Sequence, residues 1–385
     1  VGAGAALANG ALENTFFGDY AGNANTTGQY SVYIGTRAGA TATTAGNNTA
    51  LGGEALRYNT ASNLTAIGYK ALHQNTTGTD NLAIGSTAGD AITTGTQNVC
   101  IGTNAGSAIT TVSHCVFIGK DSGQTATGAG NTGIGLDALR VVTGANNTAV
   151  GIRAGDALTS AGECTFFGRD AGGGVTTGSE NTAFGAETMM AAVTGTKNTV
   201  VGRDGLRAVT SGHNNNGLGA DVIRKVTTGY HNIGFGSSAG FNLTTGYDNV
   251  AIGGEALYTE TTGYGNIAIG KAAFKLLANE STNNVAIGNL ALDAQTTGTI
   301  TEFVAVGYRA LGSHNRNASN SSCTALGGSA LAACTTGDRV TAVGGRSGEN
   351  LTTGSYSVFV GQASGYQVTT GSWNVAIGYS AMHSG

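Results

Sequence analysis

The stretch Asn-Val-Ala-Ile-Gly-Gly-Glu-Ala at residues 249–256 decides the fold, because it returns with small changes along the whole chain. A Thr-Thr-Gly follows many of the copies, as at residues 244–246 and 369–371. In a chain of 385 residues, 22 copies place a glycine at the same point of the motif, and in most copies this glycine returns at every seventeenth position. Three intervals are one position shorter, and one run lengthens by one, two and three positions. Gly2 reads as the end of a truncated copy, which predicts about 23 units.

The residues before each of these anchor glycines alternate with period two, which is typical of a β-strand. The position directly before the glycine is apolar in all 22 copies, and the position two earlier is β-branched or apolar in nearly all, as in Thr15 and Phe17. A unit of seventeen residues is too short for a helix pair or a propeller blade. We therefore predict an all-β, parallel β-solenoid in which one copy makes one coil, and we expect these two positions to fill its interior. The absence of proline fits a chain that needs its N–H groups for a ladder.

The middle position of each expected strand carries small or aromatic residues, such as Ala50, Phe117 and Ala251. A strand facing solvent would carry Lys, Glu or Thr there, so apolar residues on both faces indicate a strand covered on both sides. The chain offers no second element to cover this alanine face. We therefore expect identical chains to associate laterally as a homotrimer; the alternative is that the alanines line an exposed flat sheet.

The repeat predicts one domain over residues 1–385, with loosened coils between 275 and 323. Insertions in solenoids lie in surface loops that often belong to the binding face. The motif begins in mid-coil at Val1 and is still present at Tyr379, so both ends look uncapped and we expect a fragment of a longer chain. The alternative for the insertion is a tolerated polar loop, but it supplies the candidate receptor-contact residues, which are Ser313, His314, Asn315, Arg316 and Asn317.

Composition excludes several classes of function. Charged residues make up 10% of the chain and the net charge is −4, so there is no basic surface to attract nucleic acid. The apolar runs are too short for membrane insertion of this segment. Six histidines are scattered without ligand spacing, and no nucleophile lies beside a base. We therefore expect no enzyme activity and no cofactor.

An asparagine stands directly before the expected strand, at the fourth position ahead of the anchor glycine, in 14 of 22 copies. Stacked amides can donate to one neighbouring coil and accept from the other, which predicts a structural ladder. Three of the five cysteines, Cys115, Cys164 and Cys323, replace asparagine in this column, and Cys323 shares a coil with Cys334, so that a disulfide there is an alternative to free thiols. The ladder includes Asn81, Asn98, Asn131, Asn147, Asn181, Asn198, Asn232, Asn249, Asn266 and Asn284.

Acidic residues occupy one variable position in four consecutive coils. Carboxylates at this spacing repel one another, which makes the column a weak candidate metal site. Arginines such as Arg169 and Arg203 stand beside them, which favours a solvated, charge-compensated column, with pairing between subunits as a further alternative. The four acids are Asp170, Glu187, Asp204 and Asp221.

The Thr-Thr-Gly column is expected to close each coil, with its glycine free to adopt a positive φ. Regular threonine arrays on flat solenoids can also order water to match ice, so an ice-binding protein that uses these columns is an alternative function. The threonines are adjacent, however, and two neighbouring residues of a strand point to opposite faces.

The Asn-Val-Ala-Ile-Gly-x-x-Ala segments at 249–256 and 374–381 resemble the YadA-like head repeats of trimeric autotransporter adhesins and similar arrays in phage tail fibres and other virion fibres. The resemblance covers the whole chain, although these coils are longer and no neck, coiled-coil stalk or membrane anchor is present. It implies a left-handed β-roll, a homotrimer and a location outside the cell or on a virion. We therefore expect a structural fibre or adhesin shaft or head that presents a surface to a host glycan or protein; a self-assembling extracellular filament is the alternative.

Overall fold

The computed structural model describes residues 2–6, 12–276, 280–293, 300–314 and 322–383. The chain divides into two compact units, which we call the N-terminal unit (Val1–Thr194) and the C-terminal unit (Gly195–Gly385). Each unit is all-β and forms a parallel β-solenoid, in which successive strands of most coils begin seventeen positions apart. The fold class that the repeat predicts is therefore confirmed.

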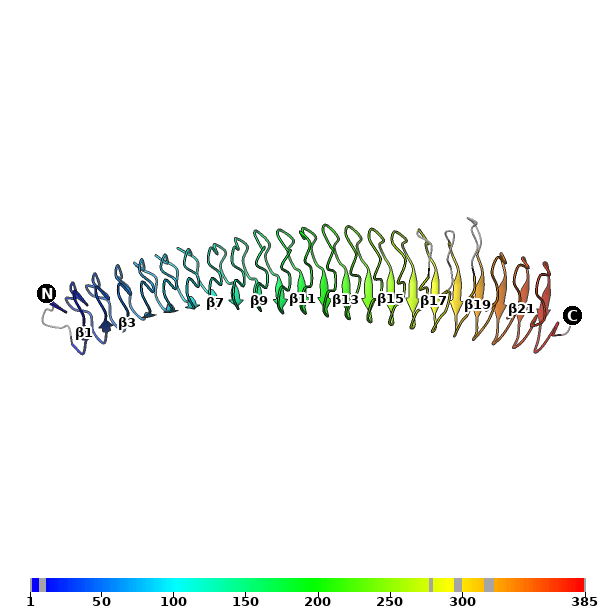
Figure 1. The fold of residues 1–385 in the computed structure, drawn as a ribbon, viewed down its shortest axis with the longest axis horizontal. Helices are drawn as coiled ribbons and strands as arrows, with labels where there is room; N and C mark the ends of the chain where they lie inside the picture. The colour runs from blue at the N-terminus through cyan, green and yellow to red at the C-terminus, as the bar shows by residue number, and fades with distance from the viewer. Residues whose placement is uncertain (1, 7–11, 277–279, 294–299, 315–321, 384–385) are drawn as a thin grey trace. The chain divides into compact units, whose positions relative to one another are not determined.

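Each coil contributes one strand of three residues, and a loop returns the chain to the next strand, as Figure 1 shows for both units. The described strands of the N-terminal unit are β1 (Thr15–Phe17), β2 (Val32–Ile34), β3 (Thr49–Leu51), β4 (Thr65–Ile67), β5 (Leu82–Ile84), β6 (Val99–Ile101), β7 (Val116–Ile118), β8 (Thr132–Ile134), β9 (Thr148–Val150), β10 (Thr165–Phe167) and β11 (Thr182–Phe184). Those of the C-terminal unit are β12 (Thr199–Val201), β13 (Asn216–Leu218), β14 (Ile233–Phe235), β15 (Val250–Ile252), β16 (Ile267–Ile269), β17 (Val285–Ile287), β18 (Val304–Val306), β19 (Thr324–Leu326), β20 (Thr341–Val343), β21 (Val358–Val360) and β22 (Val375–Ile377).

Neighbouring strands within each unit pair in parallel and in register, so that equivalent residues lie over one another. In the N-terminal unit, for example, Ala66 lies beside Ala83 and Ile67 beside Ile84. The register holds through the loosened coils, where β16 to β19 remain paired although the intervals between these strands are longer than elsewhere. The lengthened segments therefore do not interrupt the ladder of the C-terminal unit.

The middle residue of the strand fills the interior of each coil. The expectation that the first and last strand residues fill it is therefore wrong. Ala50, Ala66 and Phe117 are fully buried, whereas the residues on either side of them are half-buried or exposed. Period-two alternation defines two faces but does not say which one is inside. The strands turn the middle residue inward and leave the two flanking residues outside.

Three interior positions share the space of each coil, and their sizes compensate one another. They are the middle of the strand and the fourth and seventh positions after the anchor glycine. Where the strand supplies Phe117, the fourth position is Gly123, and an added Cβ there would overlap the Phe117 ring. Where the strand supplies Ala66, the fourth position is the buried Leu72. Where the strand supplies Ala83 and the fourth position is Gly89, the seventh position is the buried Ile92. The choice of glycine or leucine at the fourth position therefore depends on both of the other positions.

The anchor glycines and the Thr-Thr-Gly glycines are required for different reasons. The anchor Gly52 has φ +140°, and a Cβ there would lie 2.5 Å from the carbonyl oxygen of Gly68 in the next coil. The expectation of a positive φ at the Thr-Thr-Gly glycines is wrong, because Gly78 and its equivalents do not adopt one. A Cβ on Gly78 would instead overlap the Gly95 carbonyl oxygen. Close approach of neighbouring backbones therefore selects glycine at this corner.

Candidate functional site

The asparagine side chains connect neighbouring coils through buried hydrogen bonds. Asn98 donates from Nδ2 to the Val112 carbonyl oxygen at 2.9 Å, and its Oδ1 accepts from the Cys115 N–H at 3.0 Å. In the C-terminal unit, Asn232 also donates to Oδ1 of Asn215 at 3.0 Å. These amides thus satisfy backbone groups of the adjacent coil and hold neighbouring coils together.

The five cysteines are buried as thiols, so Cys323 and Cys334 form no disulfide. In the asparagine column, Cys164 donates from Sγ to the Gly178 carbonyl oxygen at 3.4 Å and so takes the place of an amide. Burial raises the pKa of Cys100 to about 12 and that of Cys164 to about 11. Because the thiolate is the reactive form, these thiols are unreactive at neutral pH.

The first threonine of the Thr-Thr-Gly column is committed to the backbone. Thr76 donates from its hydroxyl to the Thr93 carbonyl oxygen at 3.0 Å, and Thr93 donates to that of Thr110 at 3.2 Å. The second threonine, as in Thr77, is exposed. Thr76 is exposed as well, so the two rows differ in that the hydroxyls of the first row are hydrogen-bonded between coils.

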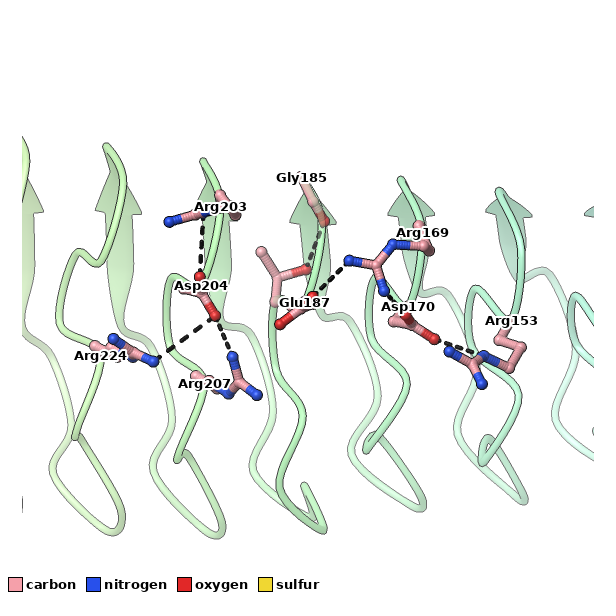
Figure 2. Close-up of polar contacts among 10 residues, drawn as sticks. Arg153, Arg169, Asp170, Gly185, Glu187, Arg203, Asp204, Arg207 and Arg224 are labelled. Atoms are coloured by element: carbon pink, nitrogen blue, oxygen red, sulfur yellow. Dashed lines mark hydrogen bonds and ion pairs between the residues drawn. The ribbon is translucent and has the colours of Figure 1, made fainter.

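In the N-terminal unit, the acidic column is compensated by arginine (Figure 2). The buried Asp170 accepts hydrogen bonds from Arg153 Nε at 2.7 Å and from Arg169 Nη1 at 2.6 Å. Arg169 continues to Glu187 in the next coil. Two guanidinium groups and two carboxylates alternate in this cluster, so its formal charges balance.

In the C-terminal unit, three guanidinium groups converge on one buried carboxylate (Figure 2). Asp204 is 6% exposed and contacts Arg203 Nε at 3.2 Å, Arg207 Nη1, and Arg224 Nη2 at 3.9 Å. Arg224 also pairs with Asp221 at 2.9 Å. We call the group formed by Arg203, Asp204, Arg207, Asp221 and Arg224 the arginine cluster.

The four acids proposed as a weak metal site thus face guanidinium groups. Among the described residues, no group of three or more His, Cys, Asp or Glu side chains is arranged to hold a metal ion. The geometry brings the acids together with cations of their own chain.

The candidate receptor-contact loop is only partly described. Asn315, Arg316 and Asn317 lie outside the described residues, and Ser313 is half-buried. His314 is 1% exposed and its ring lies 4.8 Å from that of Phe303, so its side chain is part of the interior. A ligand at the surface could not contact His314 in this conformation.

Sequence reasoning missed Glu260, a buried carboxylate at the seventh position after an anchor glycine. Its Oε1 accepts backbone N–H groups of residues 261–263 and of Glu280, and its Oε2 accepts that of Ser281. Burial raises the pKa of Glu260, against the opposing effect of these hydrogen bonds. The available signal was a single glutamate at a position that is apolar or asparagine in nearly all the other described coils.

The outer face of the strands has no assigned role so far, and we call it the apolar strand face. It consists of the first and last residue of every described strand. The last residue is aliphatic or aromatic in all of them, the first is threonine or asparagine in eleven of the 22, and none is charged. Large side chains on this face expose about two fifths of their surface to solvent. Leu51 is 45% exposed, Leu218 43% and Phe235 45%. In the C-terminal unit, Val201, Leu218 and Phe235 border an apolar hollow of about 340 Å³.

No protein-family model matches this sequence, and no curated protein matches it significantly. The described residues include no helix that is long and apolar enough to cross a membrane.

Proposed function

We propose that this chain is a structural protein that associates laterally through the apolar strand face as a homotrimer. The observation that carries the proposal is the uncharged row of half-exposed aliphatic and aromatic residues along each unit. Eleven strands at about 4.8 Å make a strip roughly 50 Å long in each unit. Contiguous apolar surfaces of this extent mark interaction sites, because exposing them to water is costly.

The association surface lies opposite to the one expected from the sequence. The coil itself covers the alanine face. The face that a partner would cover is therefore the outer face of the strands. Parallel strands are normally covered on both sides, and one side of these strands is open in the single chain. Identical chains supply a matching periodicity, because the same residue types recur at every coil.

Three copies and a place outside the cell or on a virion follow from the resemblance to trimeric adhesin heads and virion fibres. In this arrangement the chain serves as a stiff fibre shaft or head, and its stability comes from contacts between neighbouring coils. The loops and charged columns remain on the outside, where they can meet a host surface.

The mass of the purified chain in solution tests the proposal. Light scattering is expected to give three times the 38.0 kDa of one chain. Leu51→Lys with Leu218→Lys places charges on the apolar strand face and is expected to yield a folded monomer. Thr77→Lys with Thr228→Lys, at exposed threonines, is the matched control and is expected to leave the mass unchanged. A monomeric wild-type chain would contradict the proposal, and a polydisperse mass far above three chains would favour a filament.

A further inference from the structure

Aromatic rings stack in four consecutive coils of the C-terminal unit. Tyr230 stacks on Tyr247 with ring centroids 4.9 Å apart and an interplanar angle of 10°. Tyr247 stacks on Tyr264 at 4.7 Å and 4°, and His213 continues the stack beyond Tyr230 at 5.1 Å. We call Tyr230, Tyr247 and Tyr264 the tyrosine ladder. Its members are seventeen positions apart in the sequence, so each belongs to its own coil.

The coil does not require an aromatic residue at this position, which lies six residues before the anchor glycine. Outside these four copies, the position is serine, threonine, glycine or alanine in 15 of 18 copies. A small hydroxyl there can connect coils, as when Ser113 Oγ accepts the Thr96 N–H at 2.9 Å. Small residues thus serve the coil at this position, and the fold alone does not explain three consecutive tyrosines.

The rings of the ladder are packed face to face while each tyrosine stays partly exposed. Tyr264 is 38% exposed, and Tyr230 and Tyr247 are half-buried. Because Tyr247 lies between two other rings, both of its faces are covered, and a sugar or another flat ligand cannot stack on it. The ladder is therefore poorly shaped for binding a ligand by stacking, whereas an oxidant in solution can remove electrons from its exposed parts.

We propose that the tyrosine ladder is a site of oxidative cross-linking, at which a haem peroxidase with hydrogen peroxide joins neighbouring coils through a dityrosine bond. Each of two stacked phenols loses one electron and one proton, and the peroxide takes up both electrons and both protons to form two molecules of water. The two ring radicals couple through the carbon next to each hydroxyl. The hydrogen atom on each of these carbons then moves to the phenol oxygen, so the product keeps both hydroxyls and has lost two hydrogen atoms.

The ladder holds the reacting rings together before either is oxidised. A radical on Tyr247 has one phenol at 4.9 Å and another at 4.7 Å, so coupling does not wait for an encounter between two chains. The new bond closes a loop between residues seventeen positions apart, which lowers the entropy of the unfolded chain and stabilises the linked coils. The reaction takes place within one chain and does not depend on the proposed homotrimer.

The test is treatment of the dilute purified chain with a plant haem peroxidase and limiting hydrogen peroxide. Dityrosine fluorescence follows the reaction, and the intact mass under denaturing conditions reports the loss of two hydrogen atoms without added oxygen. Chymotryptic peptides locate the bond by mass spectrometry, since Phe235 and Phe241 separate Tyr230 from Tyr247. We expect a linked monomer, with Tyr247 joined to Tyr230 or to Tyr264, and a higher urea midpoint than for the untreated chain.

Tyr247→Phe keeps the stack of rings but removes the phenol that both steps share. It leaves Tyr230 and Tyr264 two coils apart, about 10 Å, and we expect the dityrosine yield to fall at least about fivefold. Circular dichroism is expected to show an unchanged fold. Tyr308→Phe is the matched control, because Tyr308 is 56% exposed, more than any tyrosine of the ladder, and we expect it to keep the wild-type yield. His213→Tyr extends the ladder by one phenol and is expected to raise the yield.

The Leu51→Lys and Leu218→Lys variant is also expected to form the bond, which separates this site from the proposed association. The proposal is overturned if no dityrosine forms, if Tyr247→Phe keeps the wild-type yield, or if Tyr308→Phe loses as much. Bonds that join other tyrosines, or linked dimers in place of linked monomers, would overturn it as well.

Discussion

The anchor position requires glycine for two reasons, a positive φ and a close contact with the next coil, and neither applies to the neighbouring Gly53. The anchor Gly52 has φ +140° and lies against the next coil, whereas the nearest atom to a Cβ on Gly53 would be 3.6 Å away in the Tyr69 side chain. The two adjacent glycines therefore separate a conformational and steric requirement from the general effect of adding a methyl group.

We predict that Gly52→Ala destabilises the fold by about 2 kcal/mol or more, through backbone strain and the clash with Gly68. Gly53→Ala is expected to change the free energy of unfolding by less than about 1 kcal/mol. Urea unfolding followed by circular dichroism measures both. Equal effects at the two positions would contradict the account of the anchor glycine.

The size exchange between Phe117 and Gly123 predicts a strong coupling. Phe117→Ala is expected to cost about 3–5 kcal/mol because it leaves a cavity, and Gly123→Leu alone would force a side chain against the ring. The double variant reproduces the Ala66 and Leu72 arrangement, and leucine already adopts the required φ at Leu72, where it is 48°. We expect the double variant to lose far less stability than the sum of the losses of the two single variants. A double-mutant cycle of unfolding free energies in urea measures this difference.

Glu260 predicts a pH dependence of stability. Because burial raises its pKa in the folded chain above the ordinary 4.5, the folded state binds the proton more tightly than the unfolded chain. This contribution to stability is therefore complete below the ordinary pKa and is lost as the pH rises through the raised value.

Glu260→Gln removes the titration while keeping an oxygen that can accept the N–H groups of residues 261–263. Unfolding midpoints between about pH 4 and about pH 8 are expected to fall more steeply for the wild type than for this variant. Parallel curves would show that Glu260 does not titrate differently in the folded and unfolded chains.

At the scale of the element, the strand and its corner were predictable in kind but not in orientation. The alternation around Ile67 and the spacing of the anchor glycines give one strand per coil. Which face is inside could not be read from the alternation, because both faces carry apolar residues, Ala66 on one and Ile67 on the other. Pattern alone assigns the bulkier side to the core, and here the smaller side is buried.

The candidate sites were also predictable in part. The asparagine and acidic columns could be placed from the repeat, because equivalent residues of successive copies must lie over one another. The pairing of Asp204 with three arginines could not, since it depends on the rotamers of long side chains in neighbouring coils. Glu260 and His314 both occupy the seventh position after an anchor glycine, and their burial follows only once this position is known to face the interior.

At the scale of the molecule, contacts between neighbouring coils make stability a sum over similar steps. We predict that deletion of residues 86–102, one complete coil of the N-terminal unit, leaves a folded solenoid, because Gly85 is then followed by Thr103 in the same register. Circular dichroism is expected to retain its β-sheet shape with a melting temperature close to that of the wild type.

Deletion of residues 86–93 is the control for this prediction. It removes about half a coil and places polar positions in the interior, so we expect it to unfold the surrounding coils. A tolerated half-coil deletion would show that register between coils is not what holds the unit together.

The regular spacing of the anchor glycines also bears on how such a chain changes over generations. Recombination between two copies of the repeat in a gene adds or removes whole coils and leaves each anchor glycine beside another. The number of coils can therefore change between related genes without any change to the core of a coil. The surface columns can change separately, one coil at a time. A chain of this design can adjust its reach and its surface chemistry independently.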